Sequence, residues 1–222
     1  MTSGATKVIP DMNTGKSVVI VVEDDAAVRE ALSSLFRSVD LAVLLYPSPA
    51  ELLARPLPDM AGCLVLDVRL PGISGFDFQE QLRRMEVLLP IVFMTGHGDI
   101  PMSVRAMKSG AVDFLAKPFR DQDMLDAVTS AIERDVARRC SSLATGQLRV
   151  LYDTLTPREK EVMAQVTTGL MNKQIAGVLG LSEITVKIHR GNAMRKMEAR
   201  SLAELVRQAD ALGLVTAGNS TR

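Results

Sequence analysis

Six polar side chains follow short apolar runs of the sequence. They are Glu23, Asp24 and Asp25 after 17–22, Asp67 after 63–66, Thr95 after 91–94, and Lys117 after 112–116. Carboxylates that gather in one place repel one another and raise each other's pKa unless a cation neutralises them, and their hard oxygens suit Mg²⁺. One carboxylate can then attack phosphorus while the metal and a lysine balance the charge on the phosphoryl oxygens. The set therefore indicates phosphoryl transfer to a protein carboxylate.

Asp67 is the best-placed nucleophile of the set because it ends a central run. Lys117 would supply a point charge, Thr95 a hydroxyl donor, and Gly96 would leave room for a phosphodonor. Each feature has a plainer explanation, since an Asp-Asp pair after a strand is usually a helix N-cap and a Lys-Pro pair is more often a loop. The conjunction favours a site. His97, inside Gly-His-Gly, is interpreted as a solvent-facing residue near the pocket rather than a catalytic base.

The first half of the chain alternates between β-branched apolar runs and segments with helical spacing. The runs are 17–22, 42–46, 63–66, 91–94 and 112–116. Strand, helix, strand at this interval predicts parallel βαβ units, and runs that are apolar on both faces suit a sheet covered by helices on both sides. We expect an α/β fold with a five-stranded parallel doubly wound sheet of the flavodoxin-like kind. The carboxyl ends of its strands would bring the polar side chains to one edge.

The second half of the chain has helical spacing throughout. Thr156, Pro157 and Glu159 make a capping box with proline at the first helical position, which marks the start of a helix. Further helices are predicted at 172–179, at 183–197, and from Ser201. Two short helices joined by Gly-Leu-Ser are the helix-turn-helix pattern, whose second helix enters the major groove of DNA. We therefore expect an all-α domain of four helices after a helical linker.

The helix predicted at 183–197 has two stripes. The inner stripe, assigned to the core, holds Val186, His189, Ala193 and Met197. The outer stripe holds Ile184, Lys187, Ile188, Gly191 and Arg195. On the outer stripe Lys187 can reach guanine acceptors or phosphates, Ile188 can touch a thymine methyl, and Gly191 allows close approach to the groove. The alternative is an ordinary solvated face. His189 is interpreted as structural or as a phosphate donor.

Composition limits the class of protein. At 222 residues and 47% hydrophobic, the chain can bury the cores of two domains. Residues 1–117 hold 11 Lys/Arg and 14 Asp/Glu, whereas residues 151–222 hold 10 and 7, which hints at a nucleic-acid partner for the second half. No apolar run approaches the roughly 20 residues that span a bilayer. Two cysteines without disulfide or metal-ligand spacing fit a reducing cytosol. We expect a cytoplasmic protein with a flexible leader at 1–16 and no membrane partner.

The first half resembles the receiver domain of two-component response regulators. The motifs VEDD, VLDVRLPGISG and FMTGHGDIPMSVRAMKSGAVDFLAKPF carry this resemblance over about residues 17–135. It implies that Asp67 accepts a phosphoryl group with Mg²⁺ as the cofactor. The implied metal ligands are Asp24, Asp25, Asp67 and the backbone carbonyl of Arg69. Thr95 and Phe114 would form the switch pair, in which the hydroxyl moves toward the phosphoryl group and the ring turns inward behind it.

The second half resembles the LuxR-type DNA-binding domain over residues 152–212, through NKQIA and TVKIHRGNAMRKM. A receiver joined to this domain is typical of the NarL/FixJ class. The motifs TGHGDIP and AKPF resemble the FixJ branch more than the NarL branch. The resemblance implies that Lys187, Ile188 and Gly191 lie at base edges. The residues that it implies nearer the phosphates are Asn172, Lys173, Thr185, Arg190 and Lys196.

This class implies a transcription regulator and not an enzyme. A sensor histidine kinase would phosphorylate Asp67, and the partners would be double-stranded promoter DNA and RNA polymerase. Phosphorylation would pair two copies as a homodimer through a face that includes Met102, Arg105, Ala106 and Lys108. The expected domains are a leader at 1–16, a receiver at 17–135, a linker at 136–151 and a DNA-binding domain at 152–222.

Two alternatives from other classes stay open at the level of sequence. A regulator could bind DNA constitutively, without phosphorylation, with the acidic edge as a relic. A phosphohydrolase of the haloacid-dehalogenase kind also uses an aspartate at a strand tip with Mg²⁺, but it wants a second acid two residues after the nucleophile, and Arg69 stands there.

Overall fold

A computed structural model describes residues 17–96 and 100–214 of the chain. The chain divides into two compact units, one up to Arg139 and one from Cys140 onward, and each is described by itself. The leader expected at 1–16 and the interpretation of His97 lie outside the described residues. The expected domain boundaries stay predictions, because helix α5 (Asp121–Asp153) runs without interruption through the segment expected to be the linker.

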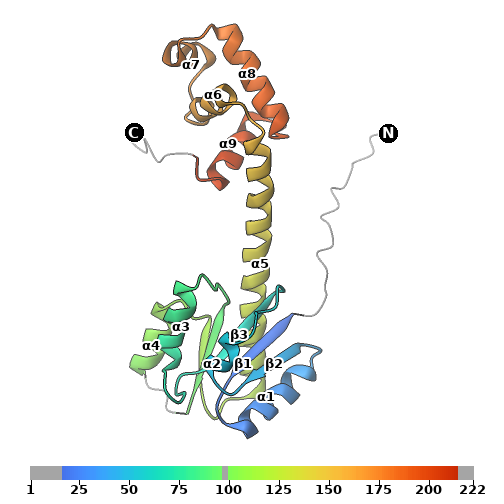
Figure 1. The fold of residues 1–222 in the computed structure, drawn as a ribbon, viewed down its shortest axis with the longest axis vertical. Helices are drawn as coiled ribbons and strands as arrows, with labels where there is room; N and C mark the ends of the chain where they lie inside the picture. The colour runs from blue at the N-terminus through green and yellow to red at the C-terminus, as the bar shows by residue number, and fades with distance from the viewer. Residues whose placement is uncertain (1–16, 97–99, 215–222) are drawn as a thin grey trace, which may run out of the picture. The chain divides into compact units, whose positions relative to one another are not determined.

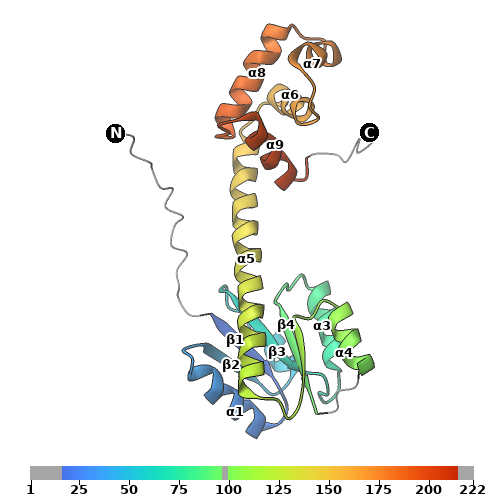
Figure 2. The ribbon, with the colours of Figure 1, turned by 180° about the vertical axis from the view of Figure 1, so that it is seen from behind.

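The first unit is built on the predicted parallel sheet (Figures 1 and 2). Its strands are β1 (Val18–Val22), β2 (Ala42–Tyr46), β3 (Gly62–Asp67), β4 (Ile91–Thr95) and β5 (Asp113–Ala116). They lie in the order β2-β1-β3-β4-β5, and every pairing is parallel. The expected five-stranded doubly wound sheet is therefore confirmed. Because all strands run the same way, their carboxyl ends meet at one edge.

Helices cover both faces of this sheet. They are α1 (Ala26–Arg37), α2 (Pro49–Leu53), α3 (Gly75–Arg84), α4 (Ile100–Lys108) and the first part of α5. Alternate residues of a strand point to opposite faces, so Ile20 and Leu66 belong to the core that includes α3, whereas Val21 and Val65 belong to the core that includes α1 and α5. Strands β1, β3 and β4 are buried along their whole length, which explains why they are apolar except where β3 and β4 end in Asp67 and Thr95.

The second unit is all-helical around its own core. After the end of α5 it contains α6 (Pro157–Thr167), α7 (Asn172–Leu179), α8 (Glu183–Lys196) and α9 (Leu202–Ala211). The predicted capping box is present: the Glu159 N–H donates to Thr156 Oγ1 at 3.3 Å, and the Thr156 N–H donates to the Glu159 carboxylate at 2.8 Å. Gly180 ends α7 with a φ of 65°, which favours glycine. The helix-turn-helix pattern is thus confirmed.

None of the helices within the described ranges is both long enough and apolar enough to cross a lipid bilayer.

Candidate functional site

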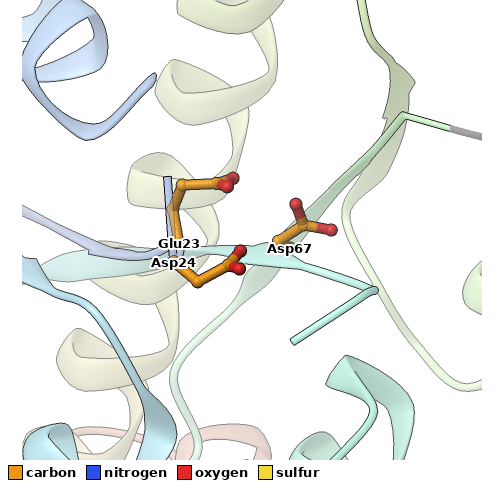
Figure 3. A group of neighbouring side chains, drawn as sticks. All are labelled: Glu23, Asp24 and Asp67. Atoms are coloured by element: carbon orange, nitrogen blue, oxygen red, sulfur yellow. The ribbon is translucent and has the colours of Figure 1, made fainter. Parts of the chain in front are cut away.

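Three carboxylates meet at the carboxyl edge of the sheet. Asp67 ends β3, and Glu23 and Asp24 directly follow the neighbouring β1. One carboxylate oxygen of each lies within 4.8 Å of the others, and Figure 3 shows Glu23 and Asp24 side by side with their carboxylates pointing toward Asp67. Glu23 and Asp67 are buried at 2% and 5% exposure, whereas Asp24 is open to solvent. The hard oxygens fit a divalent cation such as Mg²⁺.

Asp25 is not part of this cluster, which corrects the expected metal set. Its carboxylate caps helix α1 by accepting the N–H groups of Ala27 at 2.7 Å and Val28 at 3.3 Å. The chain turns from strand into helix at this point, so the third acid of the run faces the start of the helix instead of the sheet edge. The plainer explanation, that one of these acids is an N-cap, holds for Asp25, and Glu23 takes its place in the cluster.

Lys117 forms ion pairs with the two buried acids. Its ammonium donates to the Glu23 carboxylate at 2.5 Å and to the Asp67 carboxylate at 2.6 Å. Burial raises the pKa of Glu23, an effect that the Lys117 hydrogen bond opposes and the charge of Asp67 reinforces. Burial of Lys117 acts to lower its pKa, but the hydrogen bonds and charges of Asp67 and Glu23 outweigh it and leave the pKa raised. The lysine is therefore a fixed positive charge that faces Asp67 directly.

The loop after β3 fixes the second oxygen of Asp67. The Arg69 N–H donates to Asp67 Oδ1 at 2.8 Å, while Lys117 holds Oδ2. Gly75 begins α3 next to this loop, where an added Cβ would lie 2.5 Å from the Asp67 carbonyl oxygen. An open hollow of about 520 Å³ lies between Asp24 and the loop 68–74. A phosphodonor can therefore approach the acidic cluster from solvent.

The remaining residues expected at this edge lie on β4 and β5. Thr95 is fully buried at the end of β4, and its carbonyl oxygen accepts the Lys117 N–H at 2.7 Å. Gly96 follows it and is exposed. Phe114 is half-buried in the core on the α3 face, in register with Phe93. The fold thus brings Thr95 and Lys117 to the edge and keeps the Phe114 ring in the layer of side chains behind it.

The expected dimer face on α4 needs one correction. Ala106 is fully buried in the core, so it cannot form part of an exposed surface. Met102 is half-buried against the same core, and the Arg105 guanidinium lies 4.6 Å from the centre of the Phe76 ring. Lys108 is exposed. The large apolar side chains exposed on α4 are instead Ile100, Val104 and Met107.

Helix α8 presents the two predicted stripes. The inner residues Val186, Ala193 and Met197 are fully buried, and His189 is half-buried. Ile184 and Ile188 are 73% and 57% exposed, which is unusual for isoleucine unless another molecule covers it. The other exposed residues of this stripe are Lys187, Gly191 and Arg195. The outer face is therefore a mixed apolar and cationic surface.

The residues expected near phosphates divide into two groups. Lys173 is exposed and Thr185 is half-buried near the start of α8. The Arg190 guanidinium donates to the Asn172 side-chain oxygen at 3.1 Å, which ties α8 to α7. Lys196 donates to the Glu159 carboxylate at 2.6 Å and to the Thr154 carbonyl at 3.2 Å. The structure therefore gives Lys196 two contacts inside the protein, and its expected phosphate contact stays a prediction.

Sequence reasoning expected Glu23 at this edge but left it out of the metal set, and it missed Arg29 altogether. The Arg29 guanidinium donates to the carbonyl oxygens of Glu23 at 2.7 Å and Asp24 at 2.8 Å, so it holds the backbone that carries the acidic cluster. The signal for Glu23 was its place directly after the strand, one residue before Asp24. For Arg29, which lies six residues after Glu23, the sequence carried no comparable signal.

Both halves of the chain match known families. Residues 19–129 match the response regulator receiver domain, and residues 153–209 match the bacterial regulatory proteins of the luxR family. Nodulation protein W of Bradyrhizobium diazoefficiens is 58% identical over 199 residues, which cover 90% of this chain and 88% of that protein. Response regulator protein TodT of Pseudomonas putida is 44% identical over 201 residues, with 90% and 88% covered.

Solved structures agree with these matches. The response regulator StyR has a TM-score of 0.74 and 48% identity, and the match covers 88% of this chain and 98% of that one. Full-length FixJ from B. japonicum has a TM-score of 0.54 and 40% identity, with 90% and 99% covered. The likeness therefore extends over both units of the chain.

Proposed function

Since this chain belongs to the two-component response regulators of the NarL/FixJ class, which join a receiver domain to a LuxR-type DNA-binding domain, we propose that phosphorylation of Asp67 switches its DNA binding on. The family is one of transcription regulators and not of enzymes, which sets the phosphohydrolase alternative aside. A response regulator implies a sensor kinase as partner and DNA as target.

The observation that carries this proposal is the setting of Asp67. The residue is 5% exposed, its carboxylate lies near those of Glu23 and Asp24, and its two carboxylate oxygens accept from the Arg69 N–H and the Lys117 ammonium. A carboxylate held in this way is positioned to attack phosphorus without losing further rotational freedom. The phosphoryl group would enter through the open hollow beside Asp24.

The reaction forms one bond and breaks another. A carboxylate oxygen of Asp67 attacks the phosphorus of a phosphohistidine, the new O–P bond forms, and the electron pair of the broken P–N bond goes to the imidazole. Lys117 then transfers its hydrogen bond from the carboxylate to a phosphoryl oxygen. The Thr95 hydroxyl donates to another, and Phe114 follows it inward.

The acidic cluster fits a Mg²⁺ ion, because it offers three hard oxygens around one point. Glu23, Asp24, Asp67 and the Arg69 carbonyl would hold the ion. When bound, it supplies charge neutralisation for the transferring phosphoryl group. Burial raises the pKa of Glu23 and the charge of Asp67 adds to this effect, so a bound cation would favour the charged form of both acids.

Dimerisation has to contribute to the switch. Moving a population from about 1% to about 99% active needs about 5.5 kcal/mol, whereas one hydrogen bond to a charged group contributes about 1.5–3 kcal/mol. We expect the phosphorylated receivers to pair through the α4 face, with Arg105 and Lys108 at its edge. Two DNA-binding domains are then held near two half-sites of promoter DNA, and the gain in affinity comes largely from effective concentration. Recruitment of RNA polymerase would follow.

Intact mass after incubation with acetyl phosphate tests the proposal. We expect one added phosphoryl group that requires Mg²⁺ and is absent in Asp67→Asn. Asp25→Asn is the matched control, because Asp25 caps α1 outside the cluster, and it should still accept the group. No gain of mass in the wild type would overturn the proposal. Equal DNA binding by wild type and Asp67→Asn, with and without the phosphodonor, would favour the constitutive alternative.

A further inference from the structure

The second half of helix α5 exposes apolar side chains at a regular interval. Val136, Leu143 and Val150 are 42%, 55% and 68% exposed, and they lie seven residues apart. Cys140 and Gln147 stand between them and are also exposed. The five positions follow one another in steps of four and three residues, which is the 3.5-residue period of a coiled-coil seam. In heptad terms Cys140 and Gln147 occupy a positions, and the three apolar residues occupy d positions.

The seam carries no charged side chain. The Asp, Glu, Lys and Arg residues of 135–153 all fall at other positions, namely Asp135, Arg138, Arg139, Arg149 and Asp153. The small residues Ala137, Ala144 and Gly146 flank the seam. Arg139 also flanks it, and its guanidinium is paired with Asp59 and Asp135 of the same chain. Two such helices can therefore approach each other without bringing like charges together.

This stripe is not needed for the core of the second unit, which holds all of its residues except Val136. Near the end of α5, Leu148, Leu151 and Tyr152 pack into the core formed with α6–α9. Successive residues of an α-helix are about 100° apart, so Val150 lies on the side of the helix opposite Leu148 and Tyr152. The helix thus uses one face for its own core and leaves another apolar face uncovered.

We propose that residues 136–150 pair with the same residues of a second copy as a short, parallel, in-register coiled coil. A second copy is the occupant that fits, because a seam of period 3.5 is complementary to itself under two-fold symmetry. Parallel pairing also leaves both DNA-binding domains at the same end of the pair. This inference rests on the proposed function and names a second contact surface for the phosphorylated dimer.

The length of the seam makes the pairing conditional. It spans about two heptads, whereas a stable coiled coil needs three or four, and a stable interface buries more than about 1,000 Å². Such a seam cannot hold two free chains together. Once the receivers are paired, the second contact forms at a high effective concentration, so the seam closes only in the phosphorylated state.

Cys140 provides a direct test, because in a parallel in-register seam each a position faces its own copy. Full-length protein is oxidised with diamide, with and without acetyl phosphate and Mg²⁺, and the covalent dimer is measured on a non-reducing gel. We expect at least a tenfold higher rate of dimer formation after phosphorylation and none in Cys140→Ser. Cys63 cannot contribute, since it is fully buried and burial raises its pKa to about 12.

Two variants, each with one new cysteine in the Cys140→Ser background, test which face of the helix pairs. Gln147→Cys lies on the seam, and Ser142→Cys lies on another face of the same exposed stretch. We expect phosphorylation-dependent cross-linking for Gln147→Cys and at least tenfold less for Ser142→Cys. Equal cross-linking at the two positions, or cross-linking that ignores phosphorylation, would refute the seam.

Phosphoryl uptake and association are measured separately on the same samples. If intact mass shows the phosphoryl group and sedimentation shows a dimer, but neither Cys140 nor Gln147→Cys cross-links, the seam is wrong and the proposed function stands. If no phosphoryl group is gained, the proposed function fails first, and the seam, which depends on it, fails with it. Leu143→Glu should keep phosphoryl uptake and weaken the phosphorylated dimer about tenfold. Unchanged dimerisation in that variant would count against the seam.

Discussion

Replacing Lys196 with methionine separates a structural role from a DNA contact. The Lys196 ammonium lies 2.6 Å from the carboxylate of Glu159, whose side chain is 5% exposed. Methionine keeps the unbranched apolar stem of the side chain and removes the ammonium. Glu159 then loses its only charged partner within the described residues and keeps the Thr156 N–H. A hydrogen bond to a charged group is worth about 1.5–3 kcal/mol. Because the lysine side chain is 30% exposed, solvent screens part of this, and we expect a loss of about 1–2 kcal/mol in the free energy of unfolding.

Tyrosine fluorescence can follow this loss in the full-length chain. The sequence contains two tyrosines and no tryptophan, and Tyr152 packs into the core of the second unit. In a Tyr46→Phe background Tyr152 is the only reporter. With a slope of about 1 kcal/mol/M in urea, the midpoint should fall by about 1–2 M. Arg195→Met is the control, because within the described residues the side chain of that exposed arginine has one hydrogen bond, to the Asn192 side chain at 3.2 Å. Its midpoint should move by less than about 0.5 M.

Acid pH should remove the difference between wild type and Lys196→Met. Burial acts to raise the pKa of Glu159, but the hydrogen bonds from Lys196 and Thr156 outweigh it and hold the pKa below its ordinary value of 4.5. A lowered pKa stabilises the fold above the ordinary value, and that stability is lost as the pH falls through the lowered value. The gap between the two proteins should therefore be constant at neutral pH and shrink below pH 4.5.

A DNA-binding assay can show whether Lys196 contacts a phosphate instead of serving the fold. If Lys196 served mainly as a phosphate contact, Lys196→Met would flatten the slope of log affinity against log salt by about one unit and leave the urea midpoint unchanged. That pair of results would refute the structural role. We expect the slope to stay the same and the midpoint to fall.

Three further predictions concern other parts of the chain. Lys187→Ala should weaken the binding of specific DNA by about 1–3 kcal/mol if the lysine contacts a base. If the lysine contacts a phosphate, the slope of log affinity against log salt should flatten by about one unit. No change in affinity or slope would show that Lys187 does not contact the DNA. Gly75→Ala should lower the free energy of unfolding by about 1–3 kcal/mol and slow phosphoryl uptake, because its Cβ would lie 2.5 Å from the Asp67 carbonyl oxygen. Urea unfolding would measure the stability, and intact mass over time would measure the uptake. Wild-type values in both assays would show that the loop moves to accommodate the Cβ. A thiol reagent should modify Cys140 at once and Cys63 only on unfolding, because burial raises the pKa of Cys63 to about 12; two fast thiols would contradict the buried position.

The elements of this fold could be predicted because their signals are local. Strand β2 (Ala42–Tyr46) and helix α7 (Asn172–Leu179) have the bounds that the apolar period and the Gly180 stop indicate. The capping box at Thr156 and Glu159 is likewise a contact between residues three positions apart. Contacts of this range are encoded in neighbouring residues, so periodicity and capping rules detect them.

The sites could be predicted only in part. The sequence predicted that Asp67, Thr95 and Lys117 meet at one edge, because the carboxyl ends of parallel strands lie on the same side of a sheet. It could not decide which acids of the run 23–25 face that edge. Asp25 turns away to cap α1, and this depends on where the strand ends and the helix begins to within one residue.

The sequence by itself determined the two folds, the polar residues that follow each strand, and the family to which the chain belongs. Only the tertiary structure decided which charges meet. Lys117 pairs with Glu23 across 94 residues of sequence, and Lys196 pairs with Glu159 across 37. On a helix surface one residue changes the direction of a side chain by about 100°, so Ala106 faces the core while its neighbours face solvent. Such pairings depend on how the helices and strands pack against one another, so a pattern of residues that are close in sequence cannot predict them.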